Sequence, residues 1–189
     1  GLAFPDAIVH CDWLAAGSDK ARDKYAMRPY ANATLELVRD VINDVAAMFP
    51  DEHLHIGGDE VDPQCWLQDD GVRAYLEAHP EVRGTTGMMQ QFEARVTAMV
   101  EAAGKVAMAW QGVYDDVGEG ERGLPASVNV EPWKCWGGLG DAALVRAATH
   151  GRGAVQSMCW YLDWDSRWWD YYQHDPLPSD EWLAAQLGN

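Results

Sequence analysis

The sequence predicts an α/β fold that covers about four central-to-late repeats of a (β/α)8 TIM barrel. Amphipathic helical patterns alternate with short apolar runs, no glycine-rich phosphate loop follows those runs, and long loops rich in aromatic and acidic residues follow them instead. Strands that alternate with helices form right-handed β-α-β units. Because the loops after the strands build the active site of a barrel, we expect function there.

The first repeat begins with a helix over residues 32–49. Its apolar residues recur at steps of three and four, which indicates an amphipathic helix packed by one face, and Pro50 marks its end. An apolar run at residues 54–58 then predicts a buried strand of a parallel sheet. Residues 32–34 also fit the N-glycosylation pattern, although an N-cap role for Asn32 or Thr34 is the favoured interpretation.

The same alternation continues to the end of the chain. A second amphipathic pattern around residues 92–103 ends at Gly104 and precedes a strand at 105–110. The remaining elements that we expect are a strand at 127–130, a helix at 141–149, a strand at 154–160, a tryptophan-rich loop at 161–172 and a helix at 178–187.

Composition and charge exclude several classes of partner. With 189 residues, 48% of them hydrophobic, the chain can form one compact domain or a piece of one. A formal net charge of −16 opposes binding to nucleic acid and to anionic lipid. No run approaches the roughly 20 apolar residues that span a bilayer. We therefore expect neither nucleic-acid binding nor membrane insertion.

Tryptophan is unusually frequent, with ten residues against three phenylalanines. These side chains could simply fill the core. However, the flat indole ring also covers the apolar face of a sugar while its N–H reaches a hydroxyl. The four cysteines lack a C-x-x-C spacing, so we expect no structural zinc site.

The segment HIGGDEV at residues 55–61 has the strongest chemical signature. Two glycines and two adjacent carboxylates, Asp59 and Glu60, stand at the end of a predicted strand. Adjacent carboxylates point in different directions, so they cannot flank a glycosidic bond as the paired carboxylates of ordinary glycosidases do. One carboxyl could instead protonate the leaving oxygen while the other holds a substrate group, which is substrate-assisted hydrolysis.

This segment, with Cys65-Trp66, resembles the acidic signature of family 20 β-N-acetylhexosaminidases. Three later segments, WQ with DD at 110–116, VEPWK at 130–134 and WYLD at 160–163, resemble further family segments in the right order. The resemblance implies an exo-acting glycoside hydrolase without a cofactor. It would release terminal non-reducing β-linked N-acetylglucosamine or N-acetylgalactosamine from a glycan or chitooligosaccharide, with retention, through an oxazolinium intermediate.

The resemblance also implies roles for individual residues. Glu60 would be the general acid and base, Asp59 would orient the 2-acetamido nitrogen of the substrate, and Tyr161 would hydrogen-bond the acetamido oxygen. Four further residues would bind the sugar: Trp110, Trp133, Trp160 and Asp163.

For the cysteines, the resemblance implies a disulfide between Cys11 and Cys65. Cys135 and Cys159 have no implied pairing, and we expect them to be buried free thiols. The family also suggests a secreted, lysosomal or other secretory-pathway location, and a homo-oligomer is left open.

The chain departs from the family pattern in several places. Family segments with an early arginine and a late tryptophan and glutamate do not occur in it, so residues 1–189 are expected to be a partial catalytic domain without the early strands and the last strand. Gly112 and Cys159 stand where a larger residue and a proline are expected.

Two rival functions remain. His53 and His55 lie on the same side of the predicted strand with Asp59 beyond them, which would suit a metal-dependent hydrolase. His53, however, lies at the start of the strand, away from the usual site of barrel chemistry. The other rival is a non-catalytic carbohydrate-binding barrel protein that keeps a tryptophan-lined cleft.

Overall fold

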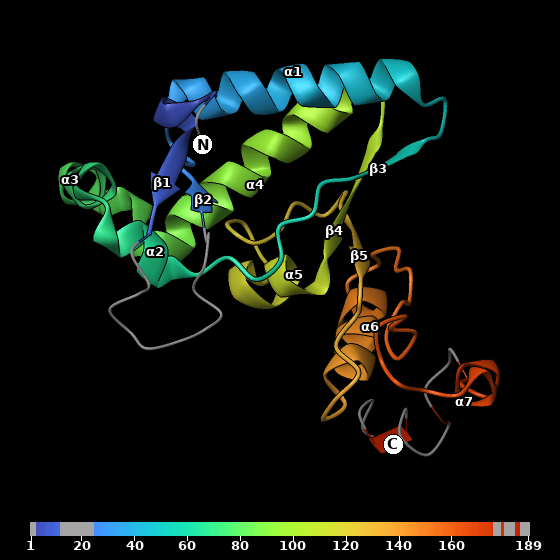
Figure 1. Ribbon diagram of the computed structural model, residues 1–189. Helices are drawn as coiled ribbons and strands as arrows, with labels where there is room; N and C mark the ends of the chain where they lie inside the picture. Colours follow the sequence, from blue (N-terminus) through green and yellow to red (C-terminus); the bar gives the residue numbers. More distant parts are fainter. Residues whose placement is uncertain (1–2, 12–24, 176–178, 180–183, 186–189) are drawn as a thin grey trace.

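A computed structural model describes residues 3–11, 25–175, 179 and 184–185 of the chain (Figure 1). Its named elements are, in chain order, η1 (Pro5–Ala7), β1 (Ile8–His10), β2 (Tyr25–Met27), α1 (Asn32–Met48), β3 (His53–His55), α2 (Pro63–Gln68), α3 (Asp70–Ala78), η4 (Pro80–Val82), α4 (Gly84–Ala102), β4 (Val106–Trp110), α5 (Gln111–Val117), β5 (Asn129–Glu131), α6 (Leu139–Thr149) and α7 (Trp168–Tyr172).

The central sheet has three parallel strands in the order β3-β4-β5, which is also their order along the chain. His55 pairs with Met108, and Trp110 pairs with Glu131. Figure 1 shows the three strands side by side, with α4 leading into β4 and α6 following β5. Because the strands are parallel, the segments that follow them begin at the same edge of the sheet.

The expected fourth strand, residues 154–160, does not form a regular strand. It runs beside β5 but makes one isolated parallel bridge, between Val130 and Ala154. The next backbone hydrogen bond of this pairing would need an N–H group at Pro132, and proline has none. The Pro132 carbonyl still accepts a hydrogen bond of 3.0 Å from the Ser157 N–H. One missing donor thus reduces the predicted strand to a short extended segment.

Helix α1 has the predicted extent but not the predicted cap. Ala31 occupies the N-cap without a side-chain hydrogen bond. The Thr34 side chain is fully buried, and its hydroxyl donates to the Ala7 carbonyl at 3.1 Å. The expected N-cap role for Asn32 or Thr34 is therefore wrong, because Thr34 ties the helix to η1 instead.

Helix α4 is longer than its apolar pattern indicated and packs against both α1 and β4. Val96 and Val100 on its inner face join the hydrophobic core with Ala107 and Ala109 of β4. Glu93 is also buried on this helix, with 4% of its surface exposed. The core thus lies between α4 and the sheet.

Several elements were not expected from the sequence. The β1–β2 hairpin is antiparallel and separate from the central sheet, and α2 and α3 precede α4 in the connection from β3 to β4. The tryptophan-rich segment at 161–172 ends in the helix α7. The expected helix at 178–187 falls mainly outside the described residues. Among the residues described, no helix has the length and hydropathy of a membrane span.

Candidate active site

The turn after β3 presents two carboxylates at the edge of the sheet. Gly57 and Gly58 have φ angles of +73° and +89°, and Glu60 has a φ of +52°. Glycine adopts such angles without the steric cost that a side chain brings. At Gly58 a Cβ would also overlap the Val113 side chain. The backbone therefore turns sharply here, and the side chains of Asp59 and Glu60 are exposed.

Gly112 closes the space behind this turn. A Cβ at this position would lie 3.2 Å from the Cα of Asp59 and 3.3 Å from its Cβ. A larger residue would press on the backbone of the acidic turn and shift it by a few tenths of an ångström, so glycine at position 112 fits the turn without strain. Helix α5 thus approaches Asp59 unusually closely.

A pocket of about 470 Å³ opens in front of the turn. The residues that line it come from the ends of β3, β4 and β5 and from the segment after the Ala154 bridge, and they are Asp59, Glu60, Trp110, Trp133, Ser157, Trp160, Tyr161 and Leu162. Segments about 100 residues apart in the sequence therefore meet around one cavity.

Six of the seven residues for which we expect a catalytic or sugar-binding role line this pocket, and Asp163 does not. Asp163 nevertheless acts on the site electrostatically. Burial raises the pKa of Tyr161, and the negative charges of Glu60, Asp163 and Asp59 raise it further. Burial and the nearby carboxylates thus act in the same direction, and both favour the protonated hydroxyl that can donate a hydrogen bond.

His55 supports Trp110 rather than binding in the pocket. Its ring lies 4.5 Å from the Trp110 ring, centre to centre. Its Nδ1 accepts a 3.0 Å hydrogen bond from the Gly57 N–H, so the proton of the neutral ring is on Nε2, which faces Glu131 at 3.4 Å. Burial lowers the pKa of His55, an effect that Glu131 and Asp59 oppose. The Gly57 N–H thus occupies Nδ1 of His55, whereas Nε2 is buried beside Glu131 without a hydrogen-bond partner among the described residues.

Gln111 was recognised in the sequence only as part of a motif, and the structure gives it a specific position. Its amide is fully buried, and its Oε1 accepts the N–H groups of Trp133 and Lys134, both at 3.2 Å. Its Nε2 donates to Leu139 O at 3.0 Å and to Asp115 at 3.2 Å. The amide thus joins the segment after β4 to the segment after β5.

Charged side chains reinforce this connection. The Lys134 ammonium lies 2.7 Å from one oxygen of Asp115, and the Arg146 guanidinium lies 2.8 Å from the other. Asp115 is partly exposed, so each ion pair alone adds little stability. Together they link Lys134, the neighbour of Trp133, to Asp115 of α5.

The aromatic residues contact one another across the pocket wall. The Tyr161 hydroxyl donates to the Trp133 carbonyl at 3.0 Å, and the two rings lie 6.4 Å apart in an edge-on arrangement. Trp164 stacks on the other face of Tyr161 at 4.6 Å. The Trp160 indole N–H donates to the Tyr171 carbonyl at 3.1 Å. Tyr161 is therefore fixed by two tryptophans.

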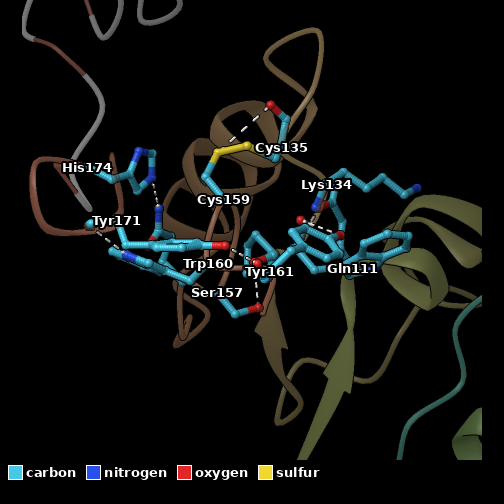
Figure 2. The surroundings of a disulfide bond; sticks show 12 residues. Gln111, Lys134, Cys135, Ser157, Cys159, Trp160, Tyr161, Tyr171 and His174 are labelled. Atoms are coloured by element: carbon cyan, nitrogen blue, oxygen red, sulfur yellow. Dashed lines mark hydrogen bonds between the residues drawn. A yellow bond between two sulfur atoms is a disulfide. The ribbon is translucent and has the colours of Figure 1, made fainter. Parts of the chain in front are cut away.

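The described residues contain two disulfides. Cys11 pairs with Cys65, as the resemblance implied, with Cα atoms 5.1 Å apart. The expectation of free thiols at Cys135 and Cys159 is wrong, because they also form a disulfide, with Cα atoms 4.9 Å apart. Their 24-residue separation gave no hint of pairing; only the parallel course of the two segments beside β5 brings them together (Figure 2).

Ser157 and Leu162 also line the pocket but were not expected there. Ser157 is at the end of the extended segment that runs beside β5, and its hydroxyl donates to Pro132 O at 3.2 Å. Leu162 is 96% exposed. Ser157 stood in the middle of the strand predicted at 154–160 and Leu162 in the loop after it, and nothing in the local pattern distinguished either residue.

A second, larger cavity of about 770 Å³ lies on the other side of the acidic turn, between α1, α4 and β3. Its lining is mostly apolar but includes Asp59, Glu60 and the buried Glu93. A Cβ on Gly58 would lie 3.3 Å from a carboxylate oxygen of Glu93. Burial raises the pKa of Glu93 to about 7. A mostly neutral carboxyl therefore lies directly behind the turn at acidic pH.

Comparison with known sequences identifies one family. The model of "Glycosyl hydrolase family 20, catalytic domain" matches residues 5–182. Beta-hexosaminidase subunit beta of Felis catus is 29% identical over 157 residues, which cover 82% of this chain and 28% of the relative. The chain thus spans little more than a quarter of the length of this curated relative.

Solved structures share the fold. A chitobiase of Flavobacterium johnsoniae matches 84% of this chain and 23% of its own, with a TM-score of 0.69 and 22% identity. An exo beta-N-acetylglucosaminidase of Vibrio harveyi, solved in complex with N-acetylglucosamine, matches 74% of this chain and 20% of its own, with a TM-score of 0.59 and 20% identity. The described residues therefore form part of the TIM-barrel catalytic domain that these proteins contain.

Proposed function

Because this chain belongs to glycosyl hydrolase family 20, we propose that the intact protein is an exo-acting β-N-acetylhexosaminidase. It releases terminal β-linked N-acetylglucosamine or N-acetylgalactosamine from the non-reducing ends of glycans or chitooligosaccharides. The observation that carries this proposal is the pocket in which Asp59 and Glu60 meet Trp110, Trp133 and Tyr161. The names of the relatives, a beta-hexosaminidase and a chitobiase, agree with it.

Glu60 is the proton donor in this proposal. It transfers its proton to the glycosidic oxygen as the bond to the anomeric carbon breaks, and it later accepts a proton from the attacking water. Its side chain is exposed at the mouth of the pocket, where a leaving group can reach it. The free carboxylic acid is thus consumed in the first step and restored in the second.

The nucleophile is the acetamido oxygen of the substrate. Asp59 and Glu60 are adjacent residues on one turn, so they do not flank the bond from opposite sides as the carboxylates of other retaining enzymes do. Asp59 hydrogen-bonds the acetamido N–H and stabilises the positive charge that develops as the oxygen attacks the anomeric carbon. The Tyr161 hydroxyl donates to the same acetamido group. Water then opens the oxazolinium, and the configuration is retained.

The aromatic walls hold the sugar. Trp110 and Trp133 enclose the acetamido methyl, and Trp160 offers a flat face to the ring. Asp163 accepts hydrogen bonds from hydroxyls at the outer edge of the sugar. Because the three tryptophans line a single pocket, they suit the terminal residue of a glycan.

The decisive experiment uses the intact protein and three compounds. A chromogenic N-acetylglucosaminide should be hydrolysed, the matched glucoside should hardly react, and a thiazoline mimic of the oxazolinium should inhibit strongly. Loss of a simple binding contact costs about 1–3 kcal/mol, or roughly 5-fold to 150-fold in rate. A glucoside rate lower by a much larger factor therefore identifies the acetamido group as the nucleophile.

Other results would point elsewhere. Comparable turnover of the glucoside, or a sugar ester trapped on Asp59 or Glu60, contradicts substrate assistance. Binding of N-acetylglucosamine without any hydrolysis would instead favour the carbohydrate-binding rival, which the tryptophan-lined pocket also suits. Loss of hydrolysis when a chelator is added would favour the metal-dependent hydrolase instead.

The two disulfides support an oxidising compartment for the protein, because disulfides persist mainly in secreted and secretory-pathway proteins. We place the intact protein there. The name of the Felis catus relative describes a subunit, and we propose that this protein also associates with a second copy. Light scattering of the intact protein tests the association, and a monomeric mass at micromolar concentration would refute it.

A further inference from the structure

The disulfide between Cys135 and Cys159 lies immediately beside the aromatic wall of the pocket. Cys135 is two residues beyond Trp133, and Cys159 directly precedes Trp160 and Tyr161. Figure 2 shows the cross-link between the segment that carries Lys134 and the segment that carries these two aromatic residues. The bond thus joins two segments that each contribute a side chain to the pocket.

Beyond the Val130–Ala154 bridge, the backbone and hydroxyl hydrogen bonds that join these two segments come, among the described residues, from Ser157 and Tyr161. The Pro132 carbonyl accepts hydrogen bonds from the backbone N–H and hydroxyl of Ser157, at 3.0 and 3.2 Å. The Tyr161 hydroxyl donates to the Trp133 carbonyl. The isolated bridge at Ala154 replaces a regular strand, because proline interrupts the ladder. The disulfide therefore supplies a connection where the sheet itself ends early.

The backbone at Cys159 supports the same interpretation. Its φ of +68° lies in the left-handed region, which residues with a side chain rarely adopt. Such conformations persist where surrounding contacts hold them, and they concentrate at functional sites. This turn directs the chain into Trp160 and Tyr161, both of which line the pocket.

We propose that the Cys135–Cys159 disulfide is a positioning cross-link of the substrate pocket, which holds Trp133 against Tyr161 so that the two enclose the acetamido group. This inference rests on the proposed function. Neither cysteine touches the substrate. The cross-link acts through the side chains on either side of it, and displacement of a positioned group by about 1 Å can cost on the order of 100-fold in rate.

The test compares two double variants of the intact protein. Cys135→Ser/Cys159→Ser removes the cross-link of the pocket, and Cys11→Ser/Cys65→Ser removes the disulfide between β1 and α2 as a matched control. The inhibition constant of the thiazoline should rise about 10-fold to 100-fold in the first variant and little in the second. A change in the fraction of folded enzyme would lower the apparent kcat but would leave this inhibition constant unchanged.

An unchanged inhibition constant in Cys135→Ser/Cys159→Ser, or an equal rise in both variants, would overturn the proposal. If the double variant does not fold, selective reduction and alkylation of the Cys135–Cys159 bond in the native protein provides the same comparison. If the unaltered protein has no glycosidase activity, the proposed function fails. Trypsin cleavage after Lys134 then tests whether the disulfide holds this segment in place. The proposal predicts that cleavage becomes about tenfold faster once the bond is lost, and an unchanged rate would refute it.

Discussion

The Tyr161 hydroxyl donates a hydrogen bond of 3.0 Å to the backbone carbonyl of Trp133. A phenol carries a single proton to donate. In the proposed reaction the same hydroxyl must donate to the acetamido oxygen of the substrate. In that reaction, substrate binding therefore replaces the Trp133 carbonyl by the acetamido oxygen as the acceptor of this hydrogen bond.

Tyr161→Phe should lower kcat by about 100-fold to 1000-fold, as expected when one donor to a reacting oxygen is removed. The lost hydrogen bond to Trp133 should lower the free energy of unfolding by only about 1 kcal/mol. Steady-state kinetics and thermal unfolding of the intact protein measure the two effects. Tyr172→Phe, at a largely exposed ring of α7, is the control. A fall in kcat of less than about threefold would remove Tyr161 from the reaction.

Glu60→Gln should reduce hydrolysis of substrates with poor leaving groups by about 100-fold to 10,000-fold, because an amide of the same shape cannot donate the proton. Substrates with very acidic leaving groups should lose much less. A plot of log kcat against leaving-group pKa measures this difference as a steeper slope. Glu52→Gln, at an exposed carboxylate before β3, should behave like the unaltered protein. Equal losses for both substrate classes would contradict the assignment of Glu60 as general acid.

Asp59→Asn should lower kcat by about 100-fold to 1000-fold and should change KM by only a few-fold. The carboxylate matters most when positive charge develops on the cyclising acetamido group, which happens in the transition state rather than in the bound substrate. Measurement of both constants on a chromogenic N-acetylglucosaminide separates the effects. A large increase in KM with an unchanged kcat would show that Asp59 only binds the ground state.

Glu93→Gln should stabilise the protein above about pH 5, increasingly so up to about pH 7. Burial raises the pKa of Glu93 from 4.5 to about 7, so the folded state resists ionisation while the unfolded state ionises at lower pH. Stability is therefore lost as the pH rises through this interval, by at most about 3 kcal/mol for this difference in pKa. Thermal unfolding of the variant and of the unaltered protein between pH 4 and pH 8 measures this difference in stability.

Glu36→Gln is the matched control for this prediction, because it makes the same chemical change at an exposed position of α1. Its difference from the unaltered protein should be small at every pH. If the stability difference between Glu93→Gln and the unaltered protein does not grow from pH 4 to pH 8, then Glu93 does not remain protonated in the folded intact protein at acidic pH.

Local patterns predicted the three strands of the central sheet and the helices α1, α4 and α6, but not the β1–β2 pair or the shorter helices. The apolar spacing from residue 32 onward predicted α1, because a helix that packs by one face repeats every 3.6 residues. The strand before Trp110 was also predicted, since β4 is apolar and flanked by glycine and polar residues. The strand predicted at residues 154–160 does not form, because the segment beside it contains Pro132 and strand pairing depends on the residues of both segments.

The candidate site shows the same division between local and tertiary information. The sequence by itself determined the acidic turn, since two glycines before Asp59 and Glu60 at the end of a strand already predicted a sharp turn that carries two carboxylates. Only the tertiary structure decided that Cys135 pairs with Cys159 and that Gln111 accepts two backbone N–H groups from the segment after β5. These contacts join residues about 20 or more positions apart. Their geometry depends on how parallel strands align at one edge of the sheet, which no local pattern of residues contains.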